Sequence, residues 1–419
     1  MNNLREYFEG ANIPVNTTSG KVTRRIYFNN AATALALKPV LEEVNANIPL
    51  LTYIDAPGPL GERNTIRYEH VRKIIIDHVG GDSKKDSVIY VKNSTEGINL
   101  LSELLYQDDT DQVILTTAME HMANYMPYKC RFETETIGIT ETGDLDLYEL
   151  ESKLQQYGKK VKIVAVTGAS NVTGITPPIY DIARLAHKYG AQIFVDAVQL
   201  VQHRPFTMKP HNDEEHIDFI AFSAHKCYTP FDGGALIGPK SFFQKFKPDL
   251  AGAGAAKFVS TEKIVFSDVP ARFEAGYPDL FGITAMGEAL MFLKKVGLNN
   301  IARYEKSLIN HARQRLENIP DIKIYGENSP NINVPILAFN IGRMDHTEIG
   351  NYLAYQHGIE VAAGAVGSDI YVQELQGIGP KDAYKLFLAG KSPGVVRISL
   401  GMYNTYDEID HLADALLNM

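Results

Sequence analysis

The sequence predicts an α/β protein with a large domain built on a mostly parallel sheet and a smaller α+β domain at the C-terminal end. Through the middle of the chain, short apolar runs rich in β-branched residues alternate with patterns of helical period. After about residue 285 the alternation gives way to a long helical stretch and then to short mixed elements. The 419 residues, 45% hydrophobic and 22% charged, have globular proportions and exceed the usual length of one domain.

Five apolar runs are expected to form buried strands because each is too short for a typical helix. They are DSVIYVKN (86–93), DQVILTTA (111–118), VKIVAVTGA (161–169), AQIFVDAV (191–198) and IDFIAFSA (217–224). A helical pattern joins the third run to the fourth. Strands joined in this way are usually parallel, so we expect a parallel sheet covered by helices.

The connecting helix is predicted within PPIYDIARLAHKYG (177–190). Thr176 is expected to cap its start, the two prolines suit its first turn, and Gly190 suits its exit. One face of the helix gathers the apolar side chains of Ile179, Ile182, Ala183 and Ala186. That face is expected to pack on the sheet.

The helical stretch AMGEALMFLKKVG, followed by NIARYEKSLINHARQRLENI, is expected to lead from one domain into the next. We place the large domain, which carries the binding site, at 30–290 and the small C-terminal domain at 291–419. Residues 1–29 are expected to form an N-terminal segment that packs with the small domain.

Composition and charge exclude several classes of function. The net charge of −9, with lysines and arginines scattered along the chain, argues against nucleic acid as a partner. The first residues, MNNLREYFEGANIPV, have neither the pattern of a signal peptide nor that of a membrane anchor. Two cysteines are too few for a disulfide framework or a cysteine-rich metal site. We therefore expect a cytoplasmic protein with no membrane partner.

Polar side chains follow each predicted strand, at the edge where open parallel sheets bind ligands. Singly, most of them have an ordinary explanation as caps or turn residues. Together they predict a ligand site. They are Ser94, Thr95, Glu120, His121, Ser170, Asn171, Asp196, Gln199, Ser223, His225 and Lys226.

Lys226 is the least ordinary of these residues, since an ammonium group at the end of a buried strand costs several kcal/mol unless it is paired or neutralised. A lysine kept partly neutral can attack a carbonyl and form a Schiff base. Pyridoxal phosphate needs such a lysine, a carboxylate for its ring nitrogen and a phosphate cradle. Asp196 suits the second need.

The remaining polar residues match the other parts of that cofactor. The phosphate suits a helix N-terminus lined by hydroxyl groups, here Ser94 and Thr95, with help from Ser223 and His225. His121 could stack on the ring. Gln199 or Asn171 could bond the ring hydroxyl group. Motifs for other ligands are missing: GxxxxGK[ST], a strand followed by GxGxxG, HExxH and CxxC. Pyridoxal phosphate is therefore the expected cofactor, and no metal is expected.

Several blocks of the sequence resemble the class V aminotransferase family and, within it, the cysteine desulfurase and selenocysteine lyase group. The blocks are YFNNAATA, STEGIN, MEHMAN, VTGASNVTG, VDAVQ, FSAHK, FEAGYPD and VRISLGMYNT, in the family's order along nearly the whole chain. The resemblance implies a fold-type I pyridoxal phosphate enzyme that is normally a homodimer with shared active sites.

The resemblance also implies roles for single residues. Lys226, His121 and Asp196 would be catalytic; Arg397, Asn29 and Ala32 would bind the substrate, Arg397 through its α-carboxylate. Ser94, Thr95, His121, Asn171, Asp196, Gln199, Ser223, His225, Lys226 and Tyr277 would bind the cofactor, Tyr277 across the subunit boundary.

Two departures from the family pattern bear on the reaction. In GIEVAAGAVGSDIYVQELQG (358–377), Gly367 stands where the desulfurases carry a nucleophilic cysteine, and Ala362 stands where an arginine is common. Tyr277 stands where the family tends to have threonine. The neighbour of the lysine, Cys227, is expected to be a packed side chain rather than a nucleophile.

The sequence therefore predicts a pyridoxal phosphate enzyme that acts at Cα or Cβ of a small amino acid. Among the possible reactions, β-elimination of the C–S lyase type ranks first. An aminotransferase or epimerase of the same family stays open, as does a cysteine desulfurase with a relocated nucleophile. A non-catalytic binding module is disfavoured because a scaffold has no physical need for Lys226, Asp196, His121 and Arg397 together. A further alternative is a nucleotide-binding α/β enzyme without this cofactor, which would differ from the expected enzyme in being colourless.

Overall fold

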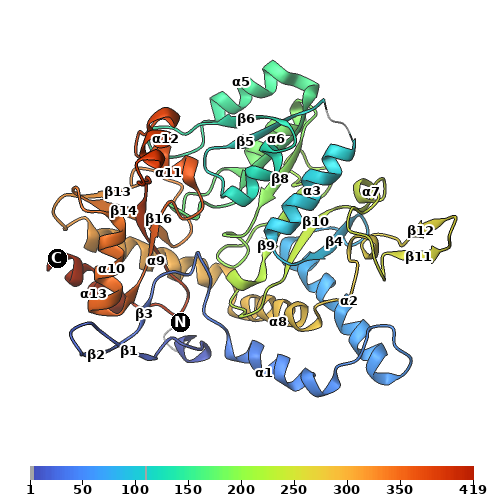
Figure 1. Cartoon of the computed structure of the whole chain (residues 1–419), viewed down its shortest axis with the longest axis horizontal. Helices are drawn as coiled ribbons and strands as arrows, with labels where there is room; N and C mark the ends of the chain where they lie inside the picture. Colours follow the sequence, from blue (N-terminus) through green and yellow to red (C-terminus); the bar gives the residue numbers. More distant parts are fainter. Residues whose placement is uncertain (1–3, 109–110) are drawn as a thin grey trace.

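A computed structural model describes residues 4–108 and 111–419, and its centre is a seven-stranded sheet (Figure 1). The strand order is β4-β10-β9-β8-β7-β5-β6. β10 is antiparallel to both of its neighbours, and the other pairings are parallel. The bounds are β4 Asp86–Val91, β5 Val113–Thr117, β6 Glu133–Ile137, β7 Val161–Thr167, β8 Gln192–Asp196, β9 Phe219–Ser223 and β10 Gly234–Pro239. The predicted mostly parallel sheet is confirmed.

Helices cover both faces of this sheet, so its strands are apolar on both sides. In β7, Val164 and Val166 join one hydrophobic cluster, whereas Ile163 and Ala165 join the cluster on the opposite face. The first cluster takes in α2 (Pro59–Val79), α5 (Leu147–Tyr157), α6 (Ile179–Lys188) and α8 (Leu280–Val296). The second takes in α3 (Ser94–Asp108), α4 (Met126–Lys129) and α7 (Lys240–Phe243). Because the strands are packed on both faces, the residues at their carboxyl ends are held in fixed positions relative to one another.

All five predicted strands form, but the expected cap of α6 is wrong. The helix begins at Ile179 after Pro178, and no side chain caps it. The Thr176 hydroxyl instead donates to the Asn331 carbonyl oxygen at 3.2 Å and accepts from Asn333 Nδ2 at 2.7 Å. Thr176 therefore ties the loop before α6 to the segment ahead of β14.

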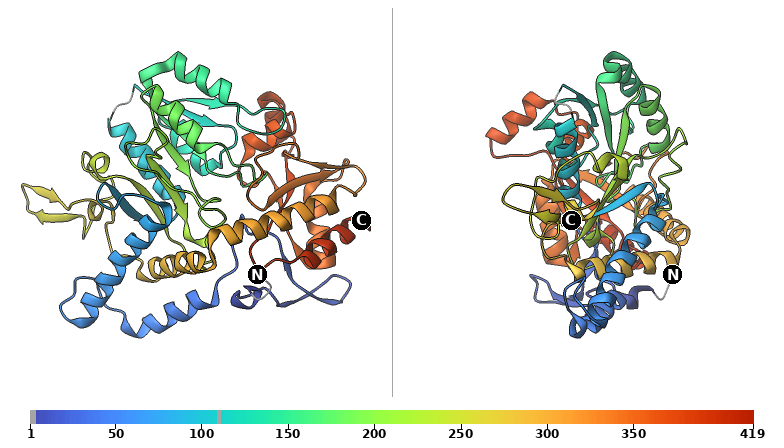
Figure 2. Two further views of the ribbon diagram at one scale, coloured as in Figure 1. Left: turned by 180° about the vertical axis from the view of Figure 1, so that it is seen from behind. Right: turned by 90° about the vertical axis from the view of Figure 1, so that its right-hand side faces the viewer.

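The C-terminal part of the chain builds a second sheet with the order β13-β14-β17-β16. Helices α8 and α9 (Leu298–Leu316) run end to end along one side of the molecule and connect the two parts (Figure 2). Gly297, at φ +88°, stands between them. The other bounds are β13 Ile322–Ile324, β14 Ile336–Ile341, α10 His346–His357, β15 Ile359–Glu360, β16 Ala362–Gly364, α11 Asp369–Leu375, α12 Pro380–Leu388, β17 Val395–Ser399 and α13 Tyr406–Leu417.

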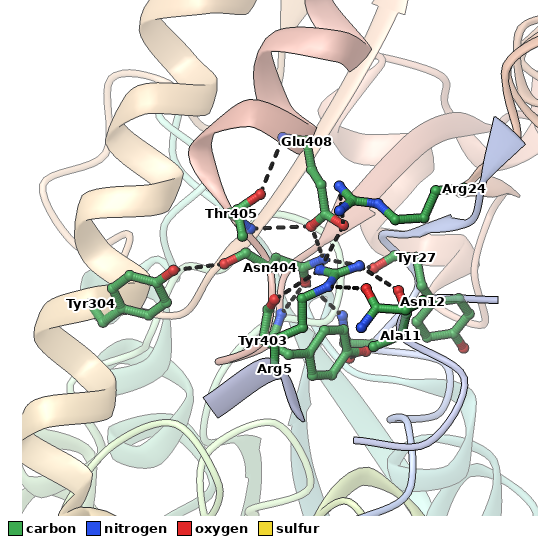
Figure 3. Close-up of polar contacts among 12 residues, drawn as sticks. Arg5, Ala11, Asn12, Arg24, Tyr27, Tyr304, Tyr403, Asn404, Thr405 and Glu408 are labelled. Atoms are coloured by element: carbon green, nitrogen blue, oxygen red, sulfur yellow. Dashed lines mark hydrogen bonds and ion pairs between the residues drawn. The ribbon is translucent and has the colours of Figure 1, made fainter. Parts of the chain in front are cut away.

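The N-terminal segment is fastened to the start of α13 through a buried carboxylate (Figure 3). Glu408 accepts from Asn404 Nδ2 at 3.0 Å and pairs with Arg5 Nη1 at 2.7 Å. Arg5 also donates to the Tyr403 carbonyl oxygen. These contacts join the segment to the start of α13; residues 1–3 lie outside the described residues, and the assignment of 1–29 as a unit stays a prediction. The domain limits at 29/30 and 290/291 stay predictions.

The remaining elements lie before the first sheet strand or form a two-stranded arm. They are β1 Pro14–Asn16, β2 Val22–Arg24, β3 Ile26–Tyr27, α1 Lys38–Asn47, β11 Ala256–Val259 and β12 Ile264–Phe266. β3 pairs in parallel with β15 and so brings residues near 29 to β17. Across 4–108 and 111–419, no helix combines the length and apolar character needed to cross a membrane.

Candidate active site

A cavity of about 440 Å³ lies at the carboxyl edge of the large sheet, closed on one side by β17. Eleven of the thirteen residues to which the sequence assigned a catalytic, cofactor or substrate role line it, whereas Glu120 and Ser170, named at strand ends without a role, do not. The eleven are Ala32, Ser94, Thr95, His121, Asn171, Asp196, Gln199, Ser223, His225, Lys226 and Arg397. The strand ends therefore meet where the sequence predicted a ligand site.

Lys226 follows β9 and Asp196 ends the neighbouring β8, which places the two groups on one wall of the cavity. Burial lowers the pKa of Lys226 to about 8; the Asp196 carboxylate opposes this shift, and the Arg397 guanidinium adds to it. Burial raises the pKa of Asp196, and the Val198 N–H bond to its Oδ1 at 3.1 Å opposes the rise. Lys226 is thus partly neutral near pH 8.

Hydroxyl groups gather at the N-terminus of α3. The Ser94 backbone N–H donates to Ser223 Oγ at 2.9 Å, and Ser223 Oγ donates to Ser94 Oγ at 2.9 Å. Thr95 and His225 line the same end of the cavity. Free N–H groups and the helix dipole favour an anion there, so this corner suits a phosphate group.

His121 also lines the cavity and stands in the chain between β5 and a short 3-10 helix, Met122–Asn124. Its Nδ1 accepts from the Ala123 backbone N–H at 3.1 Å, so the neutral ring carries its proton on Nε2. Burial, with smaller contributions from the charges of Lys226 and Arg397, lowers the pKa of His121 to about 4. The ring is therefore neutral at physiological pH.

Arg397 extends from β17 and is almost fully buried. Its Nη2 donates to Asn29 Oδ1 at 2.7 Å and its Nη1 to the Asn171 carbonyl oxygen at 3.1 Å. Burial lowers the pKa of Arg397 to about 10, which keeps it charged at neutral pH. This guanidinium has no carboxylate partner among the described residues, which suits it to an anionic group of a ligand.

Two orphaned polar atoms test whether the cavity fits pyridoxal phosphate. Within the described part of the chain, Arg397 Nε and Gln199 Oε1 are buried without a hydrogen-bond partner, although Gln199 Nε2 donates to the Ala31 carbonyl oxygen. Buried polar atoms normally have partners. The Lys226 amine, the Asp196 carboxylate, the hydroxyl-lined N-terminus of α3 and the Gln199 amide fit the cofactor's aldehyde, ring nitrogen, phosphate and ring hydroxyl, in that order. The unpaired Arg397 Nε is left for an anionic group of the substrate.

The two other predicted residues do not line the cavity. Asn29 contacts the site indirectly, because its side-chain oxygen accepts a hydrogen bond from Arg397, which does line the cavity. Tyr277 is 58% exposed and outside the cavity, with its ring centroid 5.6 Å from that of Tyr53. The chain alone therefore does not bring Tyr277 to the site.

Sequence reasoning assigned no role to Glu120, which the structure buries behind the site. Its carboxylate accepts from Thr117 Oγ1 at 2.6 Å, Asn124 Nδ2 at 2.6 Å and the Thr167 backbone N–H at 2.9 Å. These bonds join the ends of β5 and β7 to the turn that carries His121. Its position beside His121 at a strand end was the only available signal.

A second feature is the segment 365–368, which we call the roof segment; the sequence singled out Gly367 in it but not the contacts that the segment makes. Val366 and Gly367 line the cavity opposite the sheet edge. The Asn171 side chain bonds this segment at two points, with Nδ2 donating to the Val366 carbonyl oxygen and Oδ1 accepting from Ser368 Oγ. The predicted contact of Asn171 with the cofactor ring stays a prediction, to be made by its second Nδ2 hydrogen.

The lowered pKa of Lys226 predicts unusual reactivity in cofactor-free protein. Modification of Lys226 by trinitrobenzenesulfonate, followed by peptide mass spectrometry, should be half-maximal near pH 8, against about 10.4 for ordinary lysines. Asp196→Asn should move the midpoint lower, because it removes a charge that favours the ammonium form. A midpoint above pH 10 would contradict the description of the site.

Comparisons with known proteins agree with this site. The family model for aminotransferase class V matches residues 26–412. A Shigella sonnei protein named cysteine desulfurase is 32% identical over 366 residues, 85% of this chain and 83% of that protein, and an Escherichia coli O8 protein of the same name matches equally.

Solved structures give the same fold. An apo cysteine desulfurase from Thermococcus onnurineus NA1 has a TM-score of 0.83 at 27% identity, covering 94% of each chain. An Escherichia coli cysteine desulfurase has a TM-score of 0.80 at 24% identity, covering 93% of each chain, and shows the fold alone. The predicted fold type and family are confirmed. The chain belongs to the class V aminotransferase family and is a pyridoxal phosphate-dependent enzyme.

Proposed function

We propose that this enzyme is a lyase that removes a sulfur-containing or similar leaving group from Cβ of a small amino acid without a catalytic cysteine. The observation that carries the proposal is that the cavity contains Lys226, Asp196 and Arg397, yet no cysteine lines it among the described residues. Cys130 is exposed and outside the cavity lining, and burial raises the pKa of Cys227 to about 12. A thiol with that pKa is a poor nucleophile at neutral pH.

The residues divide the work by position. Arg397 binds the substrate carboxylate through its fork of N–H donors, and Asn29 holds that fork in place. Lys226, partly neutral, takes the proton from Cα and can return it to the leaving group. When bound, pyridoxal phosphate supplies an electron sink, and Asp196 keeps its ring nitrogen protonated. His121, neutral, covers the ring face with Nε2–H facing the cavity.

The test is an amino-acid panel on purified enzyme, with cysteine, cystine, selenocysteine, serine and alanine as substrates. Elimination from cysteine consumes one water and releases sulfide, pyruvate and ammonia in equal amounts, without added reductant. A keto acid formed only when a second keto acid accepts the amino group would indicate an aminotransferase. Loss of optical activity without product release would indicate an epimerase. Either outcome would replace the proposed lyase.

A cysteine desulfurase with a relocated nucleophile is the second candidate, favoured by the name of the Shigella sonnei relative. That reaction leaves alanine and a protein-bound persulfide. Alanine as the main product from cysteine would therefore support this candidate, whereas pyruvate supports the lyase.

We further infer a homodimer with shared sites, located in the cytoplasm. The exposed rings of Tyr53 and Tyr277 and the exposed apolar side chains Phe258 and Val259 of the β11–β12 arm support a second copy as partner. Tyr277 would then reach the partner's phosphate corner. Two free cysteines, one of them buried, accord with a reducing compartment.

Mixing two inactive variants tests the shared site. Lys226→Ala chains mixed with equal Tyr277→Asp chains should recover roughly a quarter of parent activity, because half of the dimers are mixed and each has one intact site. Subunit exchange is verified by native mass spectrometry with one chain isotope-labelled. No recovery despite exchange would show that Tyr277 does not serve the partner's site.

A further inference from the structure

The roof segment is fastened to the rest of the cavity on both sides. Its Gly367 carbonyl oxygen accepts from the Met122 backbone N–H at 2.7 Å, directly beside His121. Asn171 Nδ2 donates to the Val366 carbonyl oxygen at 2.9 Å. Ser368 Oγ, fully buried, donates to Asn171 Oδ1 at 2.7 Å. These three hydrogen bonds, one with Met122 and two with Asn171, hold the segment in its place over the cavity.

Gly367 leaves no room for a side chain in this closed position. A Cβ built on it would lie 2.4 Å from His121 Nε2 and 2.8 Å from Cδ2, closer than atoms pack. Its φ of +76° also favours glycine. The His121 ring therefore occupies the space where the side chain of residue 367 would be.

A nearby glycine shows that this contact is local. Gly364 also has a positive φ, +123°, but a Cβ there would meet nothing within 4 Å. It does not line the cavity. An alanine at 364 would carry backbone strain without touching His121, whereas an alanine at 367 would meet the ring.

We propose that the roof segment positions the His121 ring, with Gly367 as the contact and the Ser368–Asn171 hydrogen bond as the latch. The assignment of this effect to the elimination reaction rests on the proposed function, but the placement of the ring does not. The closed roof and a side chain at 367 are mutually exclusive. Installing a cysteine at 367 therefore does not create a persulfide-forming enzyme while the latch holds the roof.

The test compares Gly367→Ala with Gly364→Ala in holoenzyme by amide hydrogen exchange, cofactor absorbance and steady-state kinetics. Gly367→Ala should expose the Met122 amide to exchange at least tenfold faster, shift the cofactor absorbance band and lower kcat with a smaller change in KM. Gly364→Ala should keep parent absorbance and exchange at Met122. Thermal unfolding of both variants identifies any general loss of stability.

Ser368→Ala tests the latch without adding bulk. Loss of its hydrogen bond should speed exchange in 365–368 by about fivefold. Ser102→Ala is the matched control, since Ser102 is equally buried and donates one bond, to the Pro127 carbonyl oxygen, away from the roof. It should leave the roof unchanged.

Two results would overturn the proposal. The first is that Gly367→Ala and Gly364→Ala show the same exchange rate at the Met122 amide and the same cofactor absorbance. The second is that residues 365–368 exchange as slowly in Ser368→Ala as in Ser102→Ala. Exchange and absorbance do not depend on which reaction is catalysed. Failure of the proposed lyase activity would therefore leave this test intact.

Discussion

Lys226→Ala is expected to lose all measurable turnover and all borohydride-stable attachment of the cofactor. Lys226 is the only lysine that lines the cavity among the described residues, and its lowered pKa supplies the neutral amine that a carbonyl requires. Borohydride treatment of the yellow parent protein, followed by peptide mass spectrometry, should place the cofactor on Lys226. Activity should fall by more than about 10⁴-fold, the scale of removing a nucleophile that acts with its partners as a unit.

An exposed lysine provides the control for this substitution. Lys188 pairs with Glu151 on the surface, away from the cavity lining, and Lys188→Ala should keep colour, attachment and turnover. A parent protein that stays colourless with added pyridoxal phosphate would contradict the account, as would attachment at another lysine.

Asp196→Asn is expected to give the second largest loss. The amide keeps the shape and can still accept from the Val198 N–H, but it loses the charge that we propose would face the ring nitrogen. Removing one partner of a buried charged pair costs about 3–5 kcal/mol. If this whole cost falls on the transition state, kcat drops roughly 200-fold to 5,000-fold. Stopped-flow absorbance and kcat measurements check the loss.

Glu120→Gln is the matched comparison, since it makes the same carboxyl-to-amide change at the other buried carboxyl group near the site, one that is already mostly neutral at pH 7. Burial raises the pKa of Glu120 to about 8; the group accepts from Thr117, Asn124 and the Thr167 backbone N–H, and it does not itself line the cavity. Its replacement should lower the unfolding temperature more than it changes the cofactor spectrum. Equal spectral effects in both variants would contradict the assignment of Asp196.

Much of the fold was predictable because the buried strands carry their own signal. A continuous apolar run such as that of β7 is buried on both faces, so period and composition identify it without tertiary context. β10 escaped notice because its glycines dilute the pattern, and β6 because its sequence at the sheet edge, ETETI, is polar up to its last residue. Tertiary contacts also overrode the expected cap by Thr176.

The site was predictable where chemistry follows a strand end and unpredictable where it depends on distant segments. Lys226 and Asp196 stand at neighbouring strand ends, which sequence order alone brings together. The contact of Gly367 with His121 joins positions almost 250 residues apart. No local pattern encodes it, and the same holds for the use of Asn171 as the anchor of the roof segment.

Catalysis without a cysteine predicts that Cys130→Ser combined with Cys227→Ser stays active. Cys130 is exposed outside the cavity lining, and Cys227 is buried with its thiol toward the Ser223 carbonyl oxygen at 3.7 Å. The double variant should keep at least about half of the parent kcat/KM on the best substrate of the panel, a change within the scale of small packing effects. Loss of turnover with the cofactor still bound, together with a persulfide mapped to either cysteine in the parent, would contradict the claim and identify a desulfurase.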